Sequence, residues 1–97
     1  MYLKCPDLTD NKFVSYYTNF NNESYRFTFK WNEYCNCCFL SIYDNDGNEI
    51  STGIALTTNR KIINKVLPTF TFLNKDGLNL EPTAETIKDY VLAYTTE

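Results

Sequence analysis

The strongest constraint in this sequence is a strict two-residue alternation of side chains in the segment Tyr25–Trp31. Every odd position of the segment is aromatic, and every even position is Arg, Thr or Lys. Because successive side chains of a β-strand point to opposite faces, this pattern predicts a strand with one buried face and one solvated face. The segment Cys38–Tyr43 alternates in a similar way, with Cys38, Leu40 and Ile42 on one face, and it predicts a second strand.

Two turn signals join these strands to a third. The polar, Asn-rich segment Asn32–Asn36 lies between the two strands and has the length of a hairpin connection. The segment Asp44–Glu49 contains an Asp-Gly step, which supplies the positive φ of a tight turn. The segment Ile50–Leu56 then predicts a third strand, in which Gly53 indicates a β-bulge or a close approach of another backbone.

The rest of the chain predicts further short strands and one helical turn. Strand patterns occur in Phe13–Tyr17, Pro68–Leu73 and Tyr90–Thr95, and Lys61–Leu67 is either irregular or a short strand. The segment Leu80–Glu85 predicts a short helix start with Thr83 as its N-cap. About six to seven strands with at most one short helical turn indicate an all-β fold, either a small antiparallel barrel or a sandwich. We favour the barrel, because it removes exposed sheet edges.

The length of the chain, 97 residues, predicts a single β domain over residues 1–97. Residues 1–12 are expected to form an extended or loosely ordered arm of that domain. Apolar residues make up 43% of the chain and aromatic residues 16%, which is the opposite of the composition of disordered chains. We therefore expect one compact core.

Charge and the absence of histidine exclude several classes of function. The net charge is −3, and the cluster Arg60, Lys61 and Lys65 is too weak to predict nucleic-acid binding. No apolar run reaches the roughly 18 residues of a membrane span, and we recognise no secretory signal, so we expect synthesis in the cytoplasm and no membrane partner. Without histidine the chain lacks the usual general base, so we expect no enzyme and no cofactor.

Four cysteines, Cys5, Cys35, Cys37 and Cys38, raise the question of a metal site or a disulfide. Structural zinc sites usually take their ligands as two separated pairs, whereas three of these cysteines are crowded together and the fourth stands alone. A disulfide such as Cys5 to Cys35 requires an oxidising compartment. We therefore prefer reduced, structural thiols and expect no metal.

Two further patterns suggest ligand sites. Asp44, Asp46 and Asn48 resemble part of a calcium loop, but Gly47 and Ala55 stand where the loop register requires other residues, so a polar hairpin turn is the preferred interpretation. The abundant tyrosines suit a surface on which sugars or bases stack, although most of them are expected in the core or at protein contacts. A small β-barrel that binds a ligand or a carbohydrate is therefore the alternative functional hypothesis, and a metal-binding cysteine protein is a third.

Four parts of the chain together form a recognisable family pattern. They are Tyr25–Glu33, Phe39–Gly47, Ile50–Leu56 and the closing strand Tyr90–Tyr94 after Pro82-Thr83. The pattern resembles small phage baseplate proteins related to the plug domain of cyanophage contractile tails. The sequence departs from it at Cys35–Cys38, where small, turn and aromatic residues are expected, but the strand alternation stays intact.

The resemblance implies a non-enzymatic structural component of a phage tail, located in the virion as a plug at the central hub of the baseplate. The implied partners are hub, tube or spike proteins, or further copies of this chain. Five residues on faces opposite the expected core, or in polar links, are the predicted contact residues: Phe39, Tyr43, Arg60, Lys61 and Tyr94.

Overall fold

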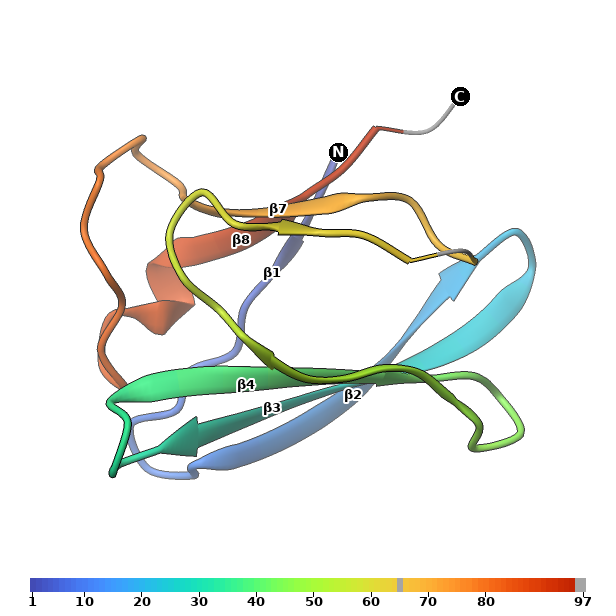
Figure 1. The fold of residues 1–97 in the computed structure, drawn as a ribbon, viewed down its shortest axis with the longest axis horizontal. Helices are drawn as coiled ribbons and strands as arrows, with labels where there is room; N and C mark the ends of the chain where they lie inside the picture. Colours follow the sequence, from blue (N-terminus) through green and yellow to red (C-terminus); the bar gives the residue numbers. More distant parts are fainter. Residues whose placement is uncertain (65, 96–97) are drawn as a thin grey trace.

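The computed structural model describes residues 1–64 and 66–95, which form eight strands and one short 3-10 helix (Figure 1). The elements are β1 (Tyr2–Lys4), β2 (Phe13–Phe20), β3 (Glu23–Asn32), β4 (Cys37–Tyr43), β5 (Glu49–Ala55), β6 (Lys61–Ile62), β7 (Phe70–Asn74), η1 (Ile87–Asp89) and β8 (Tyr90–Ala93). Lys65, which belongs to the weak basic cluster and to the segment Lys61–Leu67, lies outside the described residues.

The strands form two antiparallel sheets that face each other (Figure 1). The central sheet has the order β2-β3-β4-β5, and the terminal sheet has the order β1-β8-β7-β6. The all-β prediction is confirmed, and of its two architectures the sandwich is found: within the described residues no closed barrel forms. The favoured barrel is absent because the consecutive strands β5 and β6 belong to different sheets and do not pair with each other.

The alternation read from the sequence places side chains as predicted. The inward positions of β3, at Tyr25, Phe27, Phe29 and Trp31, are all buried. On the other face of β3, Arg26 is half-buried and Lys30 is exposed. In β4, Cys38, Leu40 and Ile42 have no exposed surface. The hydrophobic effect therefore fixes which face of the central sheet points inward.

Aromatic contacts connect the two sheets across the core. Phe27 of β3 meets Phe70 of β7 with perpendicular rings and centroids 5.7 Å apart. Phe20, at the end of β2, packs edge-on against Tyr94 after β8 at 5.3 Å, and against Phe70 at 5.9 Å. Edge-to-face packing is favoured for such rings because the positive ring edge meets the negative ring face. These rings hold the sheets in one relative position.

The hairpins use the turn chemistry that their sequences indicate. Asn21 and Asn22 connect β2 to β3, and both have positive φ, at 52° and 67°, which suits the right-handed twist of the flanking strands. In the next tight turn, the Asp44 carboxylate accepts the N–H groups of Asp46 and Asn48 at 2.9 and 2.8 Å. Gly47 supplies the positive φ of 85°. The segment proposed as a polar hairpin turn is therefore such a turn.

Gly53 marks a β-bulge in β5. The register between β4 and β5 shifts between Leu40 and Ile42, so an extra residue of β5 is accommodated there. Gly53 has a φ of 64°, and its N–H donates to Ser41 Oγ at 3.2 Å. No atom lies within 4 Å of the position that a Cβ would take, so the bulge explains this glycine and a close backbone approach does not.

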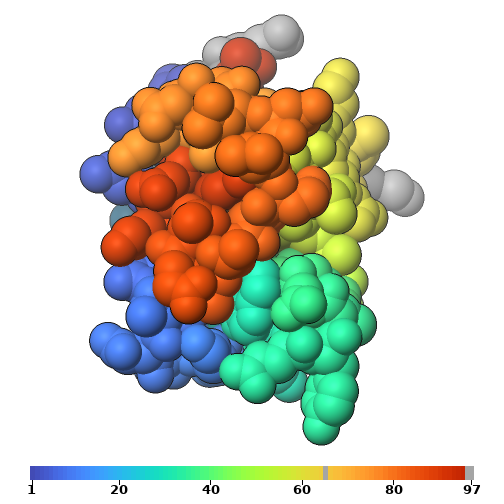
Figure 2. Space-filling model, turned by 90° about the vertical axis from the view of Figure 1, so that its left-hand side faces the viewer, coloured from blue at the N-terminus to red at the C-terminus, as the bar shows by residue number. Residues whose placement is uncertain are grey.

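One end of the sandwich is covered by the segment 75–90. Figure 2 shows this segment, in orange and red, between the N-terminal part in blue and the β3–β4 hairpin in green. The predicted short helix is found as η1, but it begins at Ile87 and not after Thr83. Thr83 and Thr86 instead bond each other's backbone N–H through their hydroxyl groups, at 2.8 and 3.2 Å. This exchange holds a turn before η1.

Among the residues that the structure describes, no helix is long and apolar enough to cross a membrane.

Replacing Phe27 by Ala is expected to lower the free energy of unfolding by about 3 to 5 kcal/mol, because the change leaves a cavity at the contact between the two sheets. Phe13→Ala removes the same atoms from a side chain that is 54% exposed, and it is expected to cost less than about 1 kcal/mol. Urea denaturation of both variants measures the difference. Equal losses would show that Phe27 does not connect the sheets.

Asp44 makes the stability of the β4–β5 turn depend on pH. Hydrogen bonds from Asn48, followed by those from Asp46 and Gly47, lower the pKa of Asp44 below its ordinary 3.8. Its stabilising contribution is therefore present above pH 4 or so and is lost as the pH falls through the lowered pKa. Compared with Asp44→Asn, the wild type is expected to lose its advantage in melting temperature on acidification. A difference that stays constant between pH 7 and pH 2 or so would contradict this role.

Candidate interaction surface

The register of the central sheet arranges its outward side chains in three rows across β2, β3 and β4. Because residues paired across antiparallel strands point to the same face, each row can be read from the pairing. The rows are Tyr17–Arg26–Tyr43, Ser15–Thr28–Ser41 and Phe13–Lys30–Phe39. The two outer rows each hold a cation between two aromatic rings, and the middle row consists of hydroxyl side chains.

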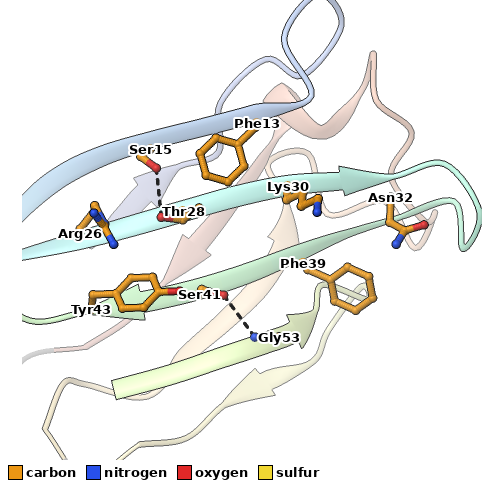
Figure 3. Close-up of a pocket in the computed structure, with 10 residues that line it drawn as sticks. All are labelled: Phe13, Ser15, Arg26, Thr28, Lys30, Asn32, Phe39, Ser41, Tyr43 and Gly53. Carbon is orange, nitrogen blue, oxygen red and sulfur yellow. Dashed lines mark hydrogen bonds between the residues drawn. The ribbon is translucent and has the colours of Figure 1, made fainter. Parts of the chain in front are cut away.

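These rows surround a shallow depression of about 460 Å³ on the outer face of the sheet (Figure 3). Eight of its lining residues come from the rows, and Asn32 and Gly53 complete it. None of these ten residues is acidic, although the chain as a whole carries a net charge of −3. The lining therefore carries two cations, Arg26 and Lys30, and no acidic side chain, while Glu49 of β5 stands beside Tyr43 on the same face, outside the lining. A cationic surface of this kind attracts negatively charged groups.

Arg26 is held in place, but one of its buried polar atoms has no partner among the described residues. Its guanidinium carbon lies 4.6 Å from the centroid of the Tyr43 ring, which is a cation–π contact. Its Nε atom is shielded from solvent and has no hydrogen-bond partner among the described residues. A shielded donor without an acceptor costs free energy, and an added carboxylate or carbonyl oxygen would remove that cost.

The hydroxyl row forms a fixed floor between the two cations. Ser15 Oγ and Thr28 Oγ1 are 3.0 Å apart and share a hydrogen bond across β2 and β3. Ser41 Oγ accepts the N–H of Gly53 at 3.2 Å, which links β4 to the bulge of β5 (Figure 3). These contacts link β2 to β3 and β4 to β5 under the depression.

The structure brings together some of the predicted contact residues and separates others. Phe39 and Tyr43 both line the depression. Lys61 begins β6 and Arg60 directly precedes it, and both line a second shallow pocket beside β5. Arg60 Nη1 donates to the carbonyl of Ala55 at 2.8 Å. Tyr94 packs on Phe20 and Phe70 at the edge of the core.

The sequence analysis missed the hydroxyl row and four residues of the two outer rows, namely Phe13, Tyr17, Arg26 and Lys30. The sequence did contain a signal for these residues. When β3 is paired with β2 and β4, its polar residues Arg26 and Lys30 stand opposite aromatic residues that also point outward. Finding the rows required the register of the strands, and the turn between β2 and β3 sets that register. The predicted first strand, Phe13–Tyr17, contains both missed aromatic residues but ends before the turn.

The four cysteines are free thiols in the structure. Cys5 and Cys38 are buried, Cys37 is half-buried and Cys35 is exposed. Burial raises the pKa of Cys38 to about 12 and also raises the pKa of Cys5 and Cys37, so these thiols stay protonated at neutral pH. In the part of the chain that the structure describes, no three His, Cys, Asp or Glu side chains are grouped to hold a metal ion.

Comparison with known protein families identifies the chain. A family model described as cyanophage baseplate Pam3 plug gp18 matches residues 3–97. The chain belongs to this family. The match covers both sheets, with all strands except the first residue of β1, so the outer face of the central sheet lies within the matched region. The resemblance inferred from the strand pattern is thereby confirmed. No curated protein matches the chain significantly.

Thiol labelling tests the placement of the cysteines. In the folded protein Cys35 is expected to react first with a disulfide reagent, Cys37 more slowly, and Cys5 and Cys38 only after unfolding, because burial both blocks access and keeps the thiols protonated. Mass spectrometry of labelled peptides measures the order. In Cys35→Ser the fast phase should disappear. Rapid labelling of Cys38 without denaturant would contradict its burial in the core.

Proposed function

We propose that this protein is a non-enzymatic plug of a phage baseplate that binds an acidic surface of another tail protein through the outer face of its central sheet. Membership of a baseplate plug family supports the general statement that the protein is a component of the virion tail and associates with other tail proteins. The proposed partners are the hub, tube or spike proteins. The proposed use of the outer face of the central sheet is supported by the depression that holds Arg26 and Lys30 between aromatic side chains.

Charge supports an acidic partner. Arg26 and Lys30 are four residues apart on β3, so their Cα atoms are about 13 Å from each other. Among the described residues the only ion pair joins Lys75, in the turn after β7, to Asp89 of η1, so neither cation of the depression forms an ion pair with a described residue. A partner with carboxylates at a similar spacing would neutralise both.

The aromatic side chains support a protein partner. Arg and Tyr are enriched among the residues that contribute most to protein contacts, because they combine apolar area with polar groups. Tyr17 is 66% exposed and Phe13 is 54% exposed, so both offer apolar surface at the rim of the depression. Of the five contact residues predicted from the sequence, Phe39 and Tyr43 belong to the proposed surface. Arg60, Lys61 and Tyr94 remain predictions.

A binding experiment tests the proposal. The purified chain is mixed with the hub, tube and spike proteins encoded beside it, and the complex is measured by light scattering and by calorimetry. Arg26→Gln is expected to weaken the complex about 10- to 100-fold, because it removes a desolvated charge from the centre of the contact. Raising the salt concentration is expected to weaken the wild-type complex more than the variant.

The matched control is Lys88→Gln, which removes one positive charge from the terminal sheet side and leaves the depression unchanged. This control is expected to bind as the wild type does. Equal losses for both variants would show that only net charge matters. Absence of any complex with all three proteins, together with a melting temperature raised by a glycan panel, would replace the proposal by the ligand-binding alternative.

A further inference from the structure

The two sheets have four free edges, and three of them are poor templates for pairing with another strand. β1 has three residues and β6 has two. β5 is longer, but its register is interrupted by the bulge at Gly53, and it begins with the charged Glu49. Very short edge strands, bulges and charges are the means by which soluble proteins prevent edge-to-edge association.

β2 differs from the other edges in each of these respects. It is eight residues long, and its register with β3 is unbroken over all eight pairs. Its sequence, Phe13–Phe20, contains no charged residue, no proline and no glycine, and it consists mainly of aromatic and β-branched residues. Such a strand has high β-propensity and nothing that repels an added strand.

The outer backbone groups of β2 are also unpaired. β2 pairs with β3 alone, and within the described residues no other backbone group bonds to Val14–Phe20. Figure 3 shows β2, marked by Ser15, as the outermost strand on its side of the sheet. In an antiparallel edge strand, alternate residues direct both N–H and C=O away from the sheet, so a row of donors and acceptors is available there.

We propose that β2 binds the β2 strand of a second copy of this chain, in antiparallel orientation about a two-fold axis. A second copy is the occupant that this edge favours, because an identical strand carries equally many unpaired groups over the same length. One contact then removes both exposed edges. The absence of charge matters for the same reason, since any charged residue near the two-fold axis would face its own copy.

The geometry of such a pair is constrained by the alternation of β2. For the two central sheets to join into one continuous sheet, outward residues must stand opposite outward residues. The two-fold axis then passes at or next to Tyr17, near the middle of the strand. The Tyr17 side chains of the two copies become direct or diagonal neighbours, roughly 5 to 8 Å apart at Cβ. The aromatic and cationic rows would then continue across both copies.

Tyr17→Glu is the variant that tests the proposal. Within one chain the new carboxylate stands opposite Arg26, a favourable pair, so the fold is expected to persist. Across the two-fold axis the two carboxylates repel each other. The wild type is expected to show a mass that rises from one to two copies with concentration, together with slowed hydrogen exchange of the β2 amides, and Tyr17→Glu is expected to stay monomeric.

Two control variants make the test specific. Thr52→Glu places the same charge on β5, the opposite edge of the central sheet, and is expected to dimerise as the wild type does. Arg26→Gln is also expected to dimerise, although it weakens the proposed binding of an acidic partner, so the two proposals fail independently. A wild type that is monomeric at every concentration would overturn the proposal. Protection of β2 that appears only with a neighbouring tail protein would overturn it too, and would assign the edge to that protein.

Discussion

The whole structure depends on the aromatic contact between the inner faces of the two sheets. β3 contributes an aromatic ring at every inward position from Tyr25 to Trp31, and Phe27 meets Phe70 of the opposite sheet edge-on. A chain of this size has only one core, so the position of these rings determines how all other strands lie. If the register of β3 shifted by one residue, its charged positions would enter the core.

The same constraint produces the candidate interaction surface. The odd positions of β3 are buried in the core, so its even positions face outward, and these include Arg26 and Lys30. The neighbouring strands place aromatic rings beside each cation, and the middle row supplies hydroxyl groups. The same alternation therefore produces both the core that connects the sheets and an outer face that carries cations, aromatic rings and hydroxyl groups.

Much of the fold was readable from the sequence, because short strands with strict alternation and turn residues leave few choices. The strand segments around Phe27, Leu40 and Phe72 and the turn at Asp44 are confirmed. The choice between barrel and sandwich was not readable, since it depends on whether β5 and β6 pair, and the alternation of either strand does not encode that. The helical turn was misplaced by a few residues: Thr83 accepts the N–H of Thr86 as an N-cap residue does, but a turn follows it and η1 begins only at Ile87.

The candidate surface was harder to predict than the fold. Phe39 and Tyr43 were predicted as contact residues because they face away from the core, whereas Arg26 and Lys30 were treated only as solvated positions. Arg26 and Lys30 become candidates for binding only through neighbours that are distant in sequence, since Tyr17 and Tyr43 flank Arg26, and Phe13 and Phe39 flank Lys30. Local patterns give the direction of a side chain, whereas the pairing of three strands gives its surroundings.

The most direct test of the account is a structure of the assembled baseplate that contains this protein. The account predicts that a neighbouring tail protein covers the outer face of the central sheet and places carboxylate oxygens within about 4 Å of the Arg26 and Lys30 nitrogen atoms. The opposite result would be an assembled tail in which this face lies open to solvent while another face of the sandwich makes the contacts. That result would contradict the central claim.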